Sequence, residues 1–404
     1  MQKYINGYGL SNEEYSLLVN KLYGVEEYYY YKNNNYYNDY LYIINELDKI
    51  KRNIPMDECY KNAIIGWYIF FKNSKRDLQH SHMCVRITDA CQLRCKHCYQ
   101  QQTVKNNKHM TFDEFVYLYY KHQDIAKKFV HYKEDFIHSC DLEGGETTLN
   151  PDLYKIIRFL NSNNVYVAVL SNGIDIKDEL IDTLKLHKKN KVQVSIDGLE
   201  KTHDFIRGEG TFKKSIEGIK KLLSNNINVS SNMVVHEQNF NDVPNVKEYI
   251  KSIGCKRTGC MLYTPQDNNF LNFLNKENLE IYMKDYKPAT SSCNGTFKCN
   301  VGNQSVIRED GGFLFCGRGY DEPVANYFTD SDDVILYNMK TFTIRYRSVP
   351  VYCFNCAKVS SCLGGSMCNS SHQNGICVFN TEDRICHVLD NKVVGDMYDI
   401  QTIL

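Results

Sequence analysis

The stretch Cys91-Gln-Leu-Arg-Cys95-Lys-His-Cys98-Tyr99 decides how the rest of the 404-residue chain is interpreted. Its cysteines are separated by three and by two residues, so a single loop presents three thiols. Structural zinc sites prefer four ligands, usually as two pairs of cysteines, and fit this spacing poorly. Three thiolates can instead bind three irons of a cubane iron–sulfur cluster and leave its fourth iron open to a small molecule.

The segment around this loop alternates short apolar runs with amphipathic stretches. The apolar runs predict strands at 83–88, 136–142, 165–170, 192–196, 229–235 and 257–262. The amphipathic stretches predict helices at 111–129, 151–162, 177–188, 211–224 and 242–253. This alternation predicts a parallel sheet with right-handed crossovers, and its six strands are too few for a closed eight-stranded barrel. In such a sheet, ligands bind at the carboxyl ends of the strands.

The rest of the chain divides into regions of different composition. Residues 1–80 are rich in Tyr, Asn and Lys and predict a small helical module, whose tyrosines we expect in the core and on the surface. The predicted domains are an N-terminal module at 1–80, an α/β core at 83–264, a linker helix region at 265–290, a cysteine-rich domain at 291–390 and a tail at 391–404.

Composition limits the partners and the compartment. The 48 basic and 48 acidic side chains cancel, which argues against nucleic acid as a partner. The longest apolar run, 63–71, is too short to cross a bilayer, and residues 1–30 show no signal peptide. We therefore expect a cytoplasmic protein without membrane association. In a reducing compartment, its 17 cysteines are more often metal ligands than disulfides.

Three further motifs stand at the ends of the second, third and fourth predicted strands. They are Gly144-Gly145-Glu146, Ser171-Asn172-Gly173 and Ser195-Ile196-Asp197-Gly198, the last followed by Arg207. Each motif alone is a weak signal. Together with a C-x3-C-x2-C loop after the first strand, their order resembles the radical S-adenosylmethionine (SAM) superfamily. The resemblance implies a partial (β/α)6 radical SAM barrel.

The resemblance also implies a cofactor site. Cys91, Cys95 and Cys98 would bind a 4Fe–4S cluster whose open iron binds SAM, and one electron would cleave SAM to methionine and a 5′-deoxyadenosyl radical. The expected SAM-binding residues are Gly144, Gly145, Glu146, Ser171, Asn172, Ser195, Asp197, Arg207 and Tyr99. In relatives, the Gly-Gly-Glu segment meets the amino group of SAM, while the residues matching Ser195 and Arg207 bind its carboxylate, a group that suits an arginine fork. His97 stands where relatives often carry an aromatic residue near adenine, and a solvent-facing side chain is the alternative.

The cysteines after residue 290 resemble the SPASM extension of radical SAM proteins, which holds two auxiliary 4Fe–4S clusters. A zinc ribbon could explain Cys353 and Cys356 but not the three earlier cysteines. The resemblance assigns the first auxiliary cluster to Cys293, Cys299 and Cys316. It assigns the second to Cys353, Cys356, Cys362 and Cys386. The family's cysteine four residues after the position of Cys362 is replaced by Ser366, so either Cys368 completes the first cluster or that cluster keeps an open iron.

This resemblance predicts an enzyme that cross-links a ribosomally made precursor peptide through a thioether or carbon–carbon bond. A flavodoxin or ferredoxin would be the reductant. One alternative is sulfatase maturation by formylglycine formation, but relatives of that kind carry an aspartate base where this chain has Gly317. Another class is a non-enzymatic iron–sulfur electron carrier, which would have no use for the pair Ser195 and Arg207.

Two roles stay open at this level. Residues 1–80 have the length of a leader-peptide-binding domain, yet they predict helices rather than the strands that capture a peptide by edge pairing. No catalytic residue is assigned. Glu309, Asp310 and Asp321 are the acids near the auxiliary-cluster cysteines, although acids in loops are usually solvated.

Overall fold

The computed structural model describes most of the predicted α/β core and two short segments that follow it. The described residues are 82–98, 107–130, 137–263, 271–272, 274–285, 306–314, 323–336 and 338, together with positions 49, 52, 54 and 55. One compact unit, formed by 79–291 and 304–335, contains nearly all of them. The N-terminal module, apart from those four positions, and the predicted auxiliary-cluster cysteines lie outside the described residues.

Six parallel strands form the centre of the sheet in chain order. They are β1 (His82–Thr88), β2 (Ser139–Gly144), β3 (Tyr166–Ser171), β4 (Lys191–Ser195), β5 (Asn228–Val235) and β6 (Thr258–Leu262). Each matches a predicted strand, because strands buried in a parallel sheet consist of short runs of apolar residues. The predicted α/β fold with a parallel sheet is confirmed.

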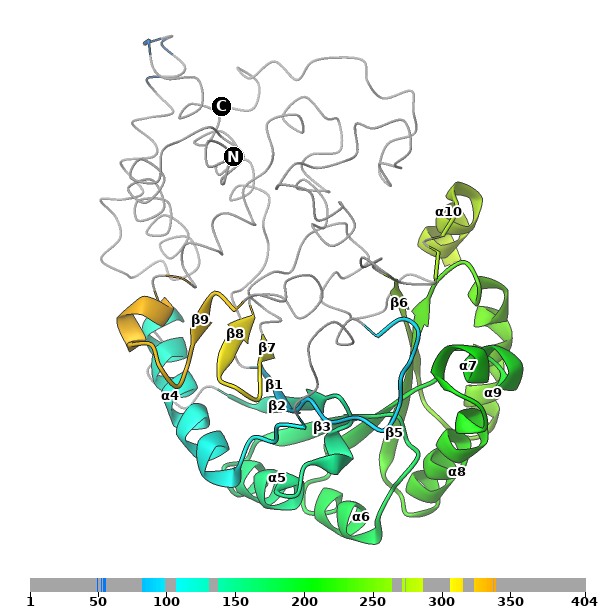
Figure 1. Cartoon of the computed structure of the whole chain (residues 1–404), viewed down its shortest axis with the longest axis horizontal. Helices are drawn as coiled ribbons and strands as arrows, with labels where there is room; N and C mark the ends of the chain where they lie inside the picture. Colours follow the sequence, from blue (N-terminus) through cyan, green and yellow to red (C-terminus); the bar gives the residue numbers. More distant parts are fainter. Residues whose placement is uncertain are drawn as a thin grey trace. The chain divides into compact units, whose positions relative to one another are not determined.

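Helices between the strands lie along the outer face of the curved sheet (Figure 1). They are α4 (Phe112–Val130), α5 (Leu153–Ser162), α6 (Asp178–Leu184), α8 (Thr211–Ser224) and α9 (Val243–Ser252). The start of α4 is a capping box, since the amide of Thr111 donates to Glu114 Oε2 at 2.8 Å and the amide of Glu114 donates to Thr111 Oγ1 at 3.3 Å. Helix α10 (Lys276–Asp285) matches the predicted linker helix. None of the helices in the described part is long and apolar enough to cross a bilayer.

Helix α7 (Glu200–Arg207) was not predicted. It follows the strand-end motif of β4, and only His203 and Ile206 are buried, so its apolar pattern is too sparse to indicate a helix. The helix ends at Gly208, whose φ of 122° suits glycine. Its last residue is Arg207. The end of the helix lies next to the cysteine loop, because the amide of Lys96 donates to the carbonyl of Ile206 at 2.9 Å.

Three short strands extend the sheet beyond β1. β7 (Val306–Ile307) pairs with β1 in parallel, and β8 (Gly312–Leu314) and β9 (Ala325–Asn326) continue the sheet in antiparallel order. The sequence did not predict them, because strands of two or three residues are too short to show a period. These three strands fall within the predicted cysteine-rich domain, yet they add directly to the core sheet.

Candidate cluster-binding and cofactor-binding site

The three-cysteine loop begins where β1 ends. The amide of Ala90 donates to Thr88 Oγ1 at 3.0 Å and fixes the first bend. Cys95 is buried, Cys91 and Cys98 are partly buried, and all three are free thiols. The amide of Leu93 donates to Cys91 Sγ at 3.4 Å, so the loop already provides a hydrogen bond to one of the sulfurs. Tyr99 lies outside the described residues.

This donor set fits a cubane cluster with three protein ligands. The described residues contain no group of three Cys, His, Asp or Glu side chains that could hold a single metal ion. A cubane does not need such a group, because each thiolate binds a different iron. Burial raises the pKa of the Cys95 thiol to about 11, although the Arg207 guanidinium lowers it. The positive charge of a bound metal would favour the thiolate at this position.

Two glycines let the end of β2 pack against the base of the cysteine loop. The amide of Gly145 donates to the Thr88 carbonyl at 2.8 Å, and the amide of Glu146 donates to the Ala90 carbonyl at 2.7 Å. A Cβ atom on Gly144 would lie 2.4 Å from the Thr88 carbonyl oxygen, and one on Gly145 would lie 2.3 Å from that of Ala90. Both glycines are therefore required by close backbone packing, and their contact with SAM stays a prediction.

The Glu146 carboxylate joins the ends of β2 and β3. It is 1% exposed, its Oε1 accepts from Ser171 Oγ at 2.8 Å, and its Oε2 accepts from the amide of Asn172 at 2.7 Å. Three predicted SAM-binding residues thus form one buried group. The Nδ2 of Asn172 is buried without a hydrogen-bond partner in the described part of the chain, as expected of a group that binds a ligand.

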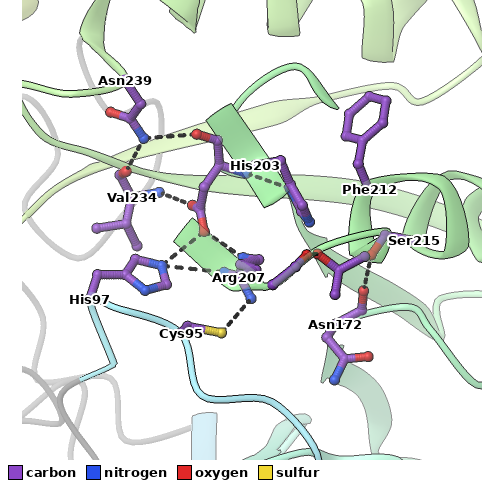
Figure 2. A network of polar contacts seen from close by, with 12 residues as sticks. Cys95, His97, Asn172, His203, Arg207, Phe212, Ser215, Val234 and Asn239 are labelled. Carbon is purple, nitrogen blue, oxygen red and sulfur yellow. Dashed lines mark hydrogen bonds and ion pairs between the residues drawn. The ribbon is translucent and has the colours of Figure 1, made fainter. Parts of the chain in front are cut away.

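Asp197 is fully buried and lies at the centre of a polar network. Figure 2 labels its partners His97, Arg207 and Val234. Its Oδ1 accepts from the amide of Val234 at 2.9 Å. Its Oδ2 contacts His97 Nε2 at 2.8 Å and accepts from Arg207 Nε at 2.5 Å. Burial alone would raise the pKa of Asp197, but Arg207 and His97 hold that pKa well below its usual value. Asp197 is therefore an anion in the folded protein.

A second layer of side chains fixes the backbone of Asp197. The amide of Asp197 donates to His203 Nδ1 at 3.2 Å, and Asn239 Nδ2 donates to the carbonyls of Asp197 and Val234 at 2.9 and 2.8 Å. Burial lowers the pKa of His203 to about 4, which keeps its imidazole neutral and lets Nδ1 act as an acceptor. Neither His203 nor Asn239 was a candidate from the sequence.

The remaining predicted contacts lie around Arg207. Arg207 Nη1 lies 3.9 Å from Cys95 Sγ, and Nη2 lies 3.4 Å from His97 Nε2. The solvent-facing alternative for His97 is wrong, since its side chain is 7% exposed and paired with Asp197. Ser195 ends β4 and is partly exposed. The binding of a SAM carboxylate by Ser195 and Arg207 stays a prediction.

Glu309 differs from the other candidate bases. It follows β7 and is 5% exposed, whereas acids in loops are usually solvated. Asp310 is bound within its turn, since its carboxylate accepts from Arg308 Nη2 at 2.8 Å and from the amide of Gly312 at 3.0 Å. Asp321 lies outside the described residues. Burial raises the pKa of Glu309 even though Arg86 lowers it.

Glu309→Gln should make the protein more stable at alkaline pH. Because the folded-state pKa of Glu309 is raised, its contribution to stability is present below the unfolded-state value and is lost as pH rises through the folded-state value. Each unit of such a shift corresponds to about 1.4 kcal/mol. Melting temperatures should show a gap in favour of the variant that is larger at pH 8 than at pH 5.5.

Asp310→Asn is the matched control for that experiment. The Asp310 carboxylate accepts hydrogen bonds from Arg308 and from the amide of Gly312. Removing its charge weakens these bonds, so the variant should lower the free energy of unfolding at neutral pH by about 1 kcal/mol. A Glu309→Gln variant that melts at or below the wild-type temperature throughout this pH range would contradict the prediction.

Comparison with protein families identifies the core. Residues 85–250 match the family model described as the Radical SAM superfamily. The chain therefore carries a radical SAM domain, as its motifs predicted. Such a domain implies a 4Fe–4S cluster and SAM as cofactors.

The relatives by sequence include proteins of peptide maturation. The chain is 28% identical over 211 residues to the sporulation killing factor maturation protein SkfB of Bacillus subtilis (strain 168), covering 51% of this chain and 49% of SkfB. It is 27% identical over 178 residues to the antilisterial bacteriocin subtilosin biosynthesis protein AlbA of the same strain, covering 43% of this chain and 38% of AlbA. The chain thus spans about half the length of these curated relatives, or less.

Solved structures share the fold at lower identity. anSMEcpe with bound AdoMet has a TM-score of 0.57 and 18% identity, covering 73% of this chain and 92% of that one. Streptococcus suis SuiB bound to precursor peptide SuiA has a TM-score of 0.56 and 14% identity, covering 85% and 89%. At these identities the similarity concerns the fold.

Proposed function

We propose that this protein is a radical SAM peptide maturase. It uses a SAM-derived radical to install a thioether or carbon–carbon cross-link in a ribosomally made precursor peptide. The observation that carries the proposal is the three-cysteine loop at the end of β1, packed against the Asp197–Arg207 network inside a radical SAM domain. The maturation roles in the names of SkfB and AlbA, and the precursor peptide bound to SuiB, favour a peptide as substrate.

Each part of the site has a role in this proposal. Cys91, Cys95 and Cys98 would hold the cluster, which together with SAM supplies a carbon radical that can abstract hydrogen. Gly144 and Gly145 keep the loop base pressed against β2. The buried carboxylate of Asp197 fixes the side chains of His97 and Arg207, which face the cysteine loop, and keeps them out of water. The site is therefore ordered before the substrate binds.

We also propose two auxiliary clusters as acceptors of the electron that remains after hydrogen abstraction. Their ligands would be Cys293, Cys299, Cys316 and Cys368 for the first, and Cys353, Cys356, Cys362 and Cys386 for the second. About twelve irons and twelve sulfides per chain after anaerobic reconstitution would agree with three cubanes. About four irons would leave the radical SAM cluster and contradict both auxiliary ones.

The test of the reaction uses short peptides encoded beside the protein's own gene. The reconstituted protein, SAM and dithionite should remove two hydrogens per cross-link, a mass loss of about 2 Da, and leave no aldehyde. Reactions without SAM serve as the control. A peptide aldehyde that reacts with hydrazide would instead indicate formylglycine formation. SAM cleavage without change in any peptide would contradict the proposed substrate class.

Deleting residues 1–80 should weaken peptide binding at least about tenfold if they bind the leader, because the affinity of the leader would be lost while the catalytic site remains. SAM cleavage should persist, which would show that the core is still folded. Peptide affinity can be measured by fluorescence anisotropy with a labelled precursor. Unchanged affinity in a truncated protein that still cleaves SAM would show that the leader binds elsewhere.

A further inference from the structure

Arg207 faces three groups at once. Its Nε donates to Asp197, its Nη1 points at Cys95 Sγ at 3.9 Å, and its Nη2 lies 3.4 Å from His97 Nε2 (Figure 2). Asp197 is fully buried, and the side chain of Arg207 is only 10% exposed. A guanidinium that only binds a cofactor carboxylate needs no contact with a cysteine sulfur, so this geometry calls for a separate explanation.

The electrostatic consequence follows from burial. Arginine is charged at every accessible pH, so Cys95 lies beside a fixed positive charge. Away from water such a charge acts strongly on its neighbours, whereas exposed charges are screened. The charge and hydrogen bonds around the sulfur ligands are among the factors that set the reduction potential of an iron–sulfur cluster.

We propose that Arg207, held in place by Asp197, tunes the reduction potential of the cluster ligated by Cys95. This inference rests on the proposed function, because it requires a cluster at the loop. The positive charge stabilises the more negative, reduced cluster and so raises its potential. The Asp197 carboxylate fixes the guanidinium by accepting from Nε and offsets part of its charge.

Arg207 and Asp197 therefore make opposite contributions. Arg207→Gln removes the positive charge and should shift the potential in the negative direction. Arg207→Lys keeps the charge but loses the planar fork, so its negative shift should be smaller. Asp197→Asn keeps an acceptor for Arg207 Nε and removes the negative charge, so its shift should be positive. A role confined to folding would not give shifts of opposite sign.

Arg94 provides the matched control. It belongs to the three-cysteine loop, is exposed and, within the part of the chain that the structure describes, donates to the carbonyls of Cys91 and Leu93 (2.8 Å each). Arg94→Gln also removes one positive charge, but at a position where water screens it. Its potential should stay close to that of the wild type.

The experiment is a potentiometric titration of the anaerobically reconstituted full chain without SAM, followed by electron paramagnetic resonance. The signal to follow is the reduced-cluster component that is absent from Cys95→Ser. Opposite shifts for Arg207→Gln and Asp197→Asn, with none for Arg94→Gln, are the expected result. SAM affinity is measured separately on the same samples.

Two other results are decisive. Equal potentials in the wild type and all Arg207 variants, with weaker SAM binding, would overturn the inference and leave Arg207 as a carboxylate ligand of SAM, with the proposed function intact. A wild-type chain that shows no such cluster signal would overturn both the inference and the proposed function.

Discussion

Cys95→Ser should lose reductive SAM cleavage by at least about 10³-fold, because a hydroxyl is a poor ligand for iron compared with a soft thiolate. The loop from Cys91 to Cys98 contains no further thiol that could replace the lost one. Iron content should fall together with activity. The measurement is 5′-deoxyadenosine formed under dithionite, alongside iron and sulfide per chain.

Cys255→Ala is the control for the loss of a buried thiol. Cys255 is buried in the connection between α9 and β6, which leads into the amino end of β6, whereas the three-cysteine loop follows the carboxyl end of β1. Its variant should keep both the iron content and SAM cleavage of the wild type. A Cys95→Ser protein with wild-type cleavage would show that the loop does not hold the catalytic cluster.

Gly145→Ala should lower both the stability and the iron content of the protein, for a different reason. The added methyl group would lie 2.3 Å from the Ala90 carbonyl oxygen and 2.6 Å from that of Asp89, both of them backbone atoms. The loop base must therefore move, and overpacking of this kind costs about 3 kcal/mol. The variant should melt at lower temperature and bind less iron, because Cys91 directly follows the displaced Ala90.

Gly210→Asn separates this effect from the loss of a glycine as such. Gly210 has a φ of 73° and no atom within 4 Å of an added Cβ. Asparagine tolerates this backbone region, as Asn164 and Asn226 show with φ values of 57° and 61°. The control should melt within a few degrees of the wild type. Equal iron content in Gly145→Ala and in this control would contradict the packing role of Gly145.

The core of the fold was predictable from the sequence, because buried strands appear as apolar runs and their helices as amphipathic ones. Helix α7 was missed because only His203 and Ile206 are buried on it. The strands β7 to β9 were missed because each has only two or three residues, and because β7 pairs with β1 through residues more than 200 positions apart, such as Cys84 and Val306.

The candidate site was predictable only in part. Motifs at strand ends could be placed at one edge of the sheet, because parallel strands end on the same side. The partners of Asp197 could not be predicted from the sequence, since His97 lies 100 residues earlier and Val234 lies 37 residues later. The burial of Glu309 was equally hidden, since its sequence neighbours Arg308 and Asp310 are charged. The auxiliary-cluster ligands and the role of residues 1–80 stay predictions.

The most direct test of the peptide-maturase proposal is deuterium transfer from substrate to cofactor product. The reconstituted protein is incubated with SAM, dithionite and a perdeuterated precursor peptide encoded beside its gene, and 5′-deoxyadenosine is analysed by mass spectrometry. The proposal predicts 5′-deoxyadenosine that carries deuterium from the peptide, formed together with a cross-linked product. Unlabelled 5′-deoxyadenosine with every such peptide unchanged would contradict it.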